Sequence, residues 1–134
     1  MLGRASYSQD FIIACRKRAE KQLKLYDALA KKAGKEMGPF APEFFNTMVL
    51  ALDHYFMHRL RGKEGKDGNP LNEVRMLAAS LLEHDGVMSA DSTIKYDPRK
   101  SVTGIAIGEK IDIDRATFET LADGFFAEIA NKFS

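Results

Sequence analysis

The chain has 134 residues, of which 45% are hydrophobic and 29% are charged, with a formal net charge of +1 at pH 7. These values exclude a disordered or fibrous protein and fit one globular domain over residues 1–134. The longest apolar runs, residues 11–15 and 48–52, are far shorter than the ~20 residues that cross a bilayer, so no membrane partner is expected. Residues 1–10 lack the apolar stretch of a secretory signal, and the single Cys15 cannot form an internal disulfide. We therefore expect a cytoplasmic protein.

The charge is unevenly distributed along the chain. Lys and Arg dominate residues 1–35, whereas Asp and Glu dominate residues 104–134. This asymmetry can mark a nucleic-acid-binding arm, but such domains are usually basic overall. We therefore expect no nucleic-acid partner, and predict that the first and last helices lie side by side with their charges partly neutralised.

The first helix is predicted over residues 7–33. Ser6 and Gln9 have the spacing of a capping box at its start, and Gly34 ends it. Apolar residues, Cys15 among them, recur at helical spacing, so we expect Cys15 in the core. Lysines follow the opposite side. They are typical of a solvated face, although an acidic partner or a membrane surface would also fit them.

Two further helices are predicted over residues 42–61 and 70–84. Residues 35–39, KEMGP, interrupt the helical pattern, so the first two helices should form an antiparallel hairpin. The second helix is apolar on most sides, which indicates a central position in the fold. Pro42 suits its first turn and Gly62 its end, whereas Asn69 and Pro70 suit the start of the third helix.

After the third helix the apolar pattern changes from helical to alternating. Residues 93–113 contain three short alternating runs separated by turn sequences, which predict a three-stranded antiparallel meander. Asp114 can cap a C-terminal helix over residues 115–133. The predicted fold class is thus α+β, mainly helical.

The meander would have two partly apolar faces, but the chain offers only about one helical layer to cover a sheet. One face, formed by Ile94, Tyr96, Ile105 and Ile107, should therefore pair with a second copy of the chain. The alternative is a monomer in which another segment folds over that face. We expect a homodimer.

His54 and His58 are four residues apart on the predicted central helix, so both imidazoles could bind one metal ion. The pattern lacks the Glu of a metalloprotease helix, and two hydrogen-bonded or partly exposed histidines would look the same. We therefore predict no cofactor, and a metal ion bound by this pair is the alternative.

A second candidate site is the polar loop over residues 61–70. Basic side chains around it could hold a phosphate or carboxylate at the N-terminus of the third helix, and the predicted set is Arg59, Arg61, Lys63, Asn69 and Arg75. The alternative is a flexible loop that Asn69 caps. Arg59 falls on an apolar face and needs a partner, either an internal carboxylate such as Glu73 or a ligand.

No motif in the sequence identifies a reaction. The favoured hypothesis is a small non-enzymatic domain that binds a ligand or another protein and acts as a homo-oligomer. The alternative is a metal-dependent or anion-handling enzyme that uses His54, His58 and the arginines near residues 61–70. A thermal-shift screen of metals and anions would separate the two.

Overall fold

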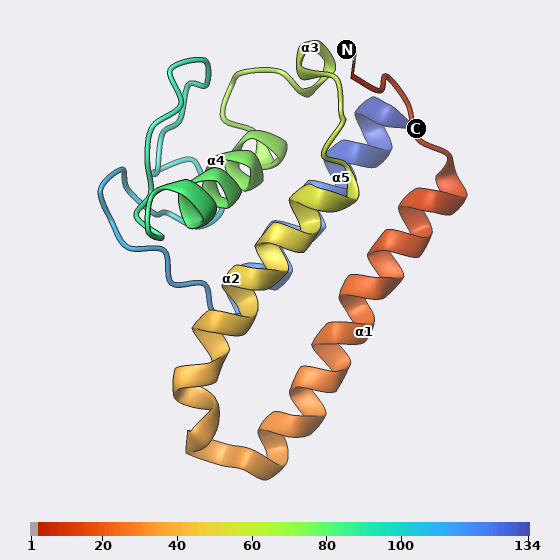
Figure 1. Ribbon diagram of the computed structural model, residues 1–134. Helices are drawn as coiled ribbons and strands as arrows, with labels where there is room; N and C mark the ends of the chain where they lie inside the picture. The colour runs from red at the N-terminus through yellow and green to blue at the C-terminus, as the bar shows by residue number, and fades with distance from the viewer. Residues whose placement is uncertain (1–2) are drawn as a thin grey trace.

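The computed structural model describes residues 3–134, in which helices are the dominant element. Figure 1 shows α1 and α2 as an antiparallel hairpin, with α5 behind α2 and α4 to one side. The elements in chain order are α1 (Gln9–Ala33), the 3₁₀ turn η1 (Gly34–Glu36), α2 (Met37–Tyr55), α3 (Arg61–Glu64), α4 (Pro70–Glu83) and α5 (Arg115–Phe133).

Helix α2 occupies the centre of the fold, as its apolar composition predicts. It packs against α1, α4 and α5. Phe45 and Leu52 of α2 and Phe56, which directly follows it, are fully buried, and Phe45 and Phe56 pack against rings of α5. The central position of this helix and the α1–α2 hairpin are both confirmed.

The start of α1 differs from the prediction. Ser8, rather than Ser6, is the N-cap, and its Oγ accepts a hydrogen bond from Phe11 N at 3.2 Å. The predicted capping box is therefore wrong, although the helix ends at Gly34 as expected. Cys15 is fully buried in the core, and this burial raises the pKa of its thiol.

The bounds of α2 also differ from the prediction. The helix begins at Met37, and Gly38 and Pro39 lie in its first turn, where Pro needs no N–H donor. Pro42 is thus inside the helix rather than at its start. The helix ends at Tyr55, and Gly62 belongs to α3 instead of ending α2.

The predicted meander over residues 93–113 is wrong. No sheet occurs within residues 3–134, where the only β pairings are two isolated bridges, Arg4 with Arg59 and Val87 with Lys110. The second bridge joins residues 86–88 to 108–111, a pairing that the sequence pattern did not indicate. Residues 84–114 instead form a long irregular segment between α4 and α5, seen at the left of Figure 1.

Side chains of the helices replace strand partners along residues 84–114. The Glu73 carboxylate of α4 accepts hydrogen bonds from the backbone N–H groups of Val102 and Thr103, both at 2.9 Å, and from Thr103 Oγ1 at 2.6 Å. Asn46 of α2 donates to the Ile111 carbonyl and accepts from Ile113 N. Separate apolar side chains of the segment pack into the helical core. This packing accounts for the alternating apolar pattern of the sequence without a sheet.

Helices α1 and α5 lie side by side, as the charge asymmetry predicts. Arg16 of α1 pairs with Asp123 of α5 at 2.9 Å. Asp27 pairs with Arg115 at 2.7 Å, and the hydrogen bond from Arg115 lowers the pKa of Asp27. Within residues 3–134 no helix combines the length and apolarity that a membrane span needs.

Candidate functional site

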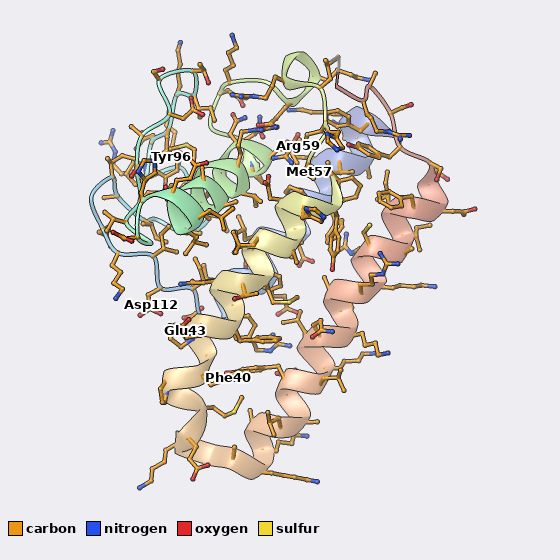
Figure 2. All side chains as sticks on the ribbon, viewed as in Figure 1. Phe40, Glu43, Met57, Arg59, Tyr96 and Asp112 are labelled. Carbon is orange, nitrogen blue, oxygen red and sulfur yellow. The ribbon has the colours of Figure 1, made fainter. Side chains whose placement is uncertain are left out.

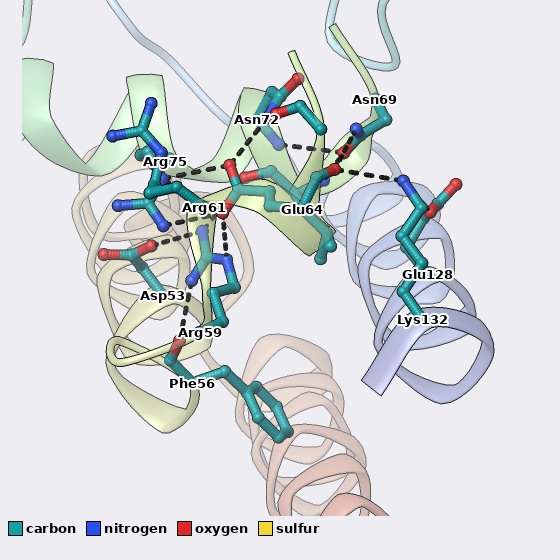
Figure 3. A network of polar contacts seen from close by, with 12 residues as sticks. Asp53, Phe56, Arg59, Arg61, Glu64, Asn69, Asn72, Arg75, Glu128 and Lys132 are labelled. Atoms are coloured by element: carbon teal, nitrogen blue, oxygen red, sulfur yellow. Dashed lines mark hydrogen bonds and ion pairs between the residues drawn. The ribbon is translucent and has the colours of Figure 1, made fainter. Parts of the chain in front are cut away.

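A network of charged and amide side chains lies where the end of α2, helix α3 and helix α4 meet (Figure 3). We call it the Arg59 network, and it consists of Asp53, Arg59, Glu64, Asn72 and Arg75. The Arg59 and Glu64 side chains are completely inaccessible to solvent, whereas those of Asp53 and Arg75 are partly exposed. Buried charges of this kind require partners that replace water.

Arg59 directs its guanidinium to groups of the chain itself. Its Nε donates to Glu64 Oε1 at 2.7 Å, and its Nη2 donates to Asp53 Oδ1 at 3.0 Å and to the Leu71 carbonyl at 3.1 Å. Nη1 donates to the Phe56 carbonyl at 3.1 Å. The guanidinium also lies over the Phe125 ring, with Cζ 5.5 Å from the ring centroid. Arg59 thereby connects α2, α3, α4 and α5.

Glu64 is the acceptor that Arg59 and Arg75 share. Arg75 Nη2 donates to Glu64 Oε1 at 2.7 Å, and Asn72 Nδ2 donates to Glu64 Oε2 at 2.7 Å. Burial raises the pKa of Glu64, but the hydrogen bond from Arg75 and the positive charges of Arg59 and Arg75 outweigh it. The pKa of Glu64 therefore lies below its usual value, and the carboxylate stays ionised.

Two asparagines hold the loop between α3 and α4. Asn69 caps α4 by accepting from Leu71 N at 2.9 Å, and its Nδ2 donates to the Glu64 carbonyl at 2.8 Å. Asn72 accepts from Gly68 N at 2.9 Å. Gly68 has a φ of 86° and passes against the Lys95 carbonyl, so any side chain there would be strained and obstructed. The cap at Asn69 is confirmed, and the loop has a defined path.

The structure places the five predicted anion-binding residues as follows. Arg59 and Arg75 share Glu64, and Asn69 caps α4. Arg61 Nη2 donates to Thr93 Oγ1 at 2.9 Å and lies 3.9 Å from Asp91. Lys63 Nζ donates to the Ala5 carbonyl at 2.9 Å. An anion would have to compete with these groups, and the site stays a prediction.

The internal partner of Arg59 is Glu64 rather than Glu73. Glu73 is buried two residues before Arg75 in α4, but its carboxylate binds residues 102 and 103 instead. The placement of Arg59 on an apolar face correctly indicated an internal or bound carboxylate. The choice among the acidic residues of the loop could not be made from the sequence, because Glu64 turns inward only through the short helix α3.

The histidine pair does not share a helix. His54 lies in the last turn of α2, but His58 follows the end of that helix, and both are exposed. The backbone carbonyl of His58 accepts from Arg4 N. Residues 3–134 contain no group of three or more His, Cys, Asp or Glu side chains arranged to hold a metal ion. Metal binding by the pair stays an untested alternative, and it has lost its original geometric support.

The four residues of the predicted dimer face do not form one exposed surface. Ile94 and Ile105 are only 8% and 7% exposed, since both pack into the core of the same chain. Tyr96 is partly buried, and its hydroxyl donates to the Ile105 carbonyl at 2.6 Å. Ile107 alone is well exposed, at 49%. Most of this predicted face is buried within the chain itself, so it no longer supplies a reason for a homodimer.

A different apolar surface lies between α2 and α4. A groove of about 460 Å³ is lined mainly by apolar side chains, and we call it the α2–α4 groove. Its lining residues are Thr47, Leu50, Ala51, Asp53, His54, Met57, Ala78 and Leu82. The sequence did not predict this groove, although Met57 and Leu82 lie within the helices predicted over residues 42–61 and 70–84. Their exposure depends on the angle between the two helices, which a single helix pattern does not contain.

Comparisons of this chain with protein-family models, with curated proteins and with solved structures give no match. The fold and site therefore define only a class, a mainly helical protein in which a buried charge network fixes the junction of three helices.

Proposed function

We propose that this protein is a non-enzymatic protein-interaction domain that forms a homodimer through the α2–α4 groove. The observation that carries the proposal is the exposure of two large apolar side chains in this groove, Leu82 at 71% and Met57 at 48%. Figure 2 labels Met57 at the upper end of α2. Full burial of such a side chain is worth about 1.5–3 kcal/mol, which favours a contact that covers it.

The charges around the groove support a second copy of the chain as the occupant. Asp53 and His54 are its only ionisable lining residues, so two copies of the groove would not bring strong like charges together. In such a dimer, a two-fold axis would place the α2–α4 groove of one copy against the α2–α4 groove of the other. Two-fold symmetric dimers are the commonest oligomers.

The Arg59 network supports a structural role for the charged residues. Its arginines and carboxylates bond to one another and to backbone carbonyls, and Arg59 and Glu64 are inaccessible to solvent. A group that reacts with a substrate must reach it, so these side chains suit a rigid scaffold better than a catalytic centre. We keep the cytoplasm as the proposed compartment, because the single Cys15 is buried and has no partner cysteine in the sequence.

Sedimentation equilibrium tests the dimer. We expect twice the 15.0 kDa chain mass at micromolar concentration, and the chain mass alone for the double variant Met57→Glu, Leu82→Glu. Ile107→Glu is the matched control, because it places the same charge on an exposed isoleucine outside the groove, and it should remain a dimer. A wild-type mass of 15.0 kDa, or a dimer that only Ile107→Glu dissociates, would reject the proposal.

A further inference from the structure

The end of the α1–α2 hairpin projects beyond the rest of the molecule. Arg115, the first residue of α5, pairs with Asp27 of α1, so the part of α1 after Asp27 extends past the start of α5. The last buried residue of α1 is Leu23. We call residues 24–44 the hairpin tip, which forms the lower end of the two helices in Figure 1.

The hairpin tip carries an apolar surface that no other element of residues 3–134 covers. Leu25, Leu29 and Phe40 are 55%, 50% and 44% exposed. Partly buried rings lie beneath them, because Phe40 stacks on Phe44 and Phe44 stacks on Tyr26, each pair with centroids 5.5 Å apart. This ring stack joins α2 to α1, and Figure 2 labels Phe40 near the lower end of α2.

Basic side chains continue the apolar surface along α1. At 100° per residue, one side of this helix within an arc of about 80° contains Arg18, Lys21, Leu25, Leu29 and Lys32, which we call the α1 stripe. The three cations are exposed, and within the described chain they form no ion pair. Glu20 and Asp27 lie on the far side of the helix, and Glu36 and Glu43 are the other acidic residues near the tip.

We propose that the hairpin tip and the α1 stripe together dock an acidic amphipathic helix of a partner protein. Leu25, Leu29 and Phe40 would pack against its apolar side, and Arg18, Lys21 and Lys32 would pair with its carboxylates. Helices α1 and α2 lie side by side, and a third helix commonly packs across such a pair. This surface is separate from the α2–α4 groove and does not depend on the dimer.

Charge distinguishes this occupant from a second copy of the same chain. Two copies that met through the α1 stripe would place Arg18, Lys21 and Lys32 against the same cations, which repel. A membrane surface is a weaker match, since the rings of Tyr26 and Phe44 are already half covered and only three large apolar side chains remain to enter lipid.

A peptide selection tests the proposal on the full chain. The probe is a displayed library of helical peptides with Leu or Phe at i, i+4 and i+7, in which the flanking positions are either Glu or Lys. We expect Glu to be enriched over Lys among the binders. Binding of a selected peptide, measured by fluorescence anisotropy, should weaken about tenfold in Leu29→Ser and in the double variant Lys21→Glu, Lys32→Glu.

The controls change equivalent residues elsewhere. Ile107→Ser removes an isoleucine as exposed as Leu29, and Lys100→Glu reverses an exposed lysine on residues 84–114. Both should bind within about twofold of wild type, because distant sites act independently. All five substituted positions on α1 and on residues 84–114 are exposed, and circular dichroism would verify that each variant is folded.

Three results would overturn the proposal: no binder from the library, equal enrichment of Glu and Lys, or binders that the α1 variants do not affect. Binding to phosphatidylserine vesicles that exceeds binding to the selected peptide would assign the surface to membranes instead. The sedimentation test of the α2–α4 groove is unaffected by any of these results, so the two proposals can fail separately.

Discussion

The buried charges of Arg59 and Glu64 are compensated by each other and by separate polar partners, the Asp53 carboxylate for Arg59 and the Asn72 and Arg75 side chains for Glu64. A buried ion pair of this kind contributes little net stability compared with apolar residues of the same shape, but the loss of one partner leaves the other charge uncompensated. Asp53 cannot replace Glu64 as the partner of Arg59. Asp53 accepts a hydrogen bond from Nη2 of Arg59, whereas Glu64 accepts the one from Nε.

Replacement of Glu64 by Gln should therefore destabilise the protein strongly. We expect Glu64→Gln to lower the free energy of unfolding by about 3–5 kcal/mol at pH 7, measured by urea denaturation. Glu83→Gln, an exposed residue of α4, is the control and should change it by less than about 0.5 kcal/mol.

The loss of stability in Glu64→Gln should also depend on pH. The pKa of Glu64 is lowered in the folded state, so its stabilising contribution is complete above the unfolded value of about 4.3 and is lost as the pH falls through the folded value. The difference between wild type and Glu64→Gln should narrow below about pH 4. A difference that stays constant on acidification would mean that Glu64 is not held as a carboxylate.

At the scale of elements, the four long helices were predictable from the sequence, whereas α3 and residues 84–114 were not. Asn69 and Asp114 cap α4 and α5 as predicted, because a cap and a 3.6-residue period are local signals. Alternating apolar residues have two structural solutions, a paired strand or separate insertions into a helical core. Here the Glu73 and Asn46 side chains accept hydrogen bonds from backbone N–H groups of the segment in place of a neighbouring strand, and both residues lie far from those groups in sequence.

The candidate site was also predicted only in part, because only some of its features are local in the sequence. The position of Arg59 on an apolar helix face indicated a carboxylate partner, and that much is local information. The identity of the partner depends on α3, a helix of Arg61–Glu64 that the glycines of the loop concealed. The hairpin tip and the α2–α4 groove depend on how the helices are arranged, which no single helical pattern specifies.

Residues 84–114 should depend on the Glu73 carboxylate for their order. In Glu73→Gln, one acceptor oxygen must serve three donors and an N–H₂ group would face N–H groups, so we expect a loss of about 1–3 kcal/mol. Amide hydrogen exchange at Val102 and Thr103 should accelerate, while the far-ultraviolet circular dichroism of the helices stays unchanged.

Glu109→Gln is the matched control for this variant. Glu109 also accepts a backbone hydrogen bond within the segment, from Ala106 N at 2.9 Å, but it is exposed, so water can replace it. Equal acceleration of exchange in the two variants would show that Glu73 has no special role.

At the scale of the whole molecule, the basic charges of α1 and the acidic charges of α5 neutralise each other only in part. Arg16 pairs with Asp123 across α1 and α5, but the cations of the α1 stripe face solvent. The net charge of +1 therefore conceals a basic surface on α1 beside an apolar hairpin tip, and an apolar groove on the other side of α2. The molecule has two separate surfaces that a partner could cover.

The irregular path of residues 84–114 has a consequence for folding kinetics. Helix α5 can dock on α2 and α4 only if this long connection closes, and closure costs entropy whether or not the segment is ordered. Because the side chains that anchor it, Asn46 and Glu73, lie on α2 and α4, the segment should become ordered after the helices have packed, on the native side of the rate-limiting barrier.

Stopped-flow measurements would separate the two stages. Ile105→Val should cost about 0.5–1.5 kcal/mol, and nearly all of that loss should appear as unfolding that is about 2–12-fold faster, with refolding almost unchanged. Leu52→Ala in the centre of α2 should instead slow refolding, and the opposite pattern would place the segment in the folding nucleus. If the segment does settle last, its anchors at Glu73 and Asn46 govern how long the native state persists rather than how quickly it is reached.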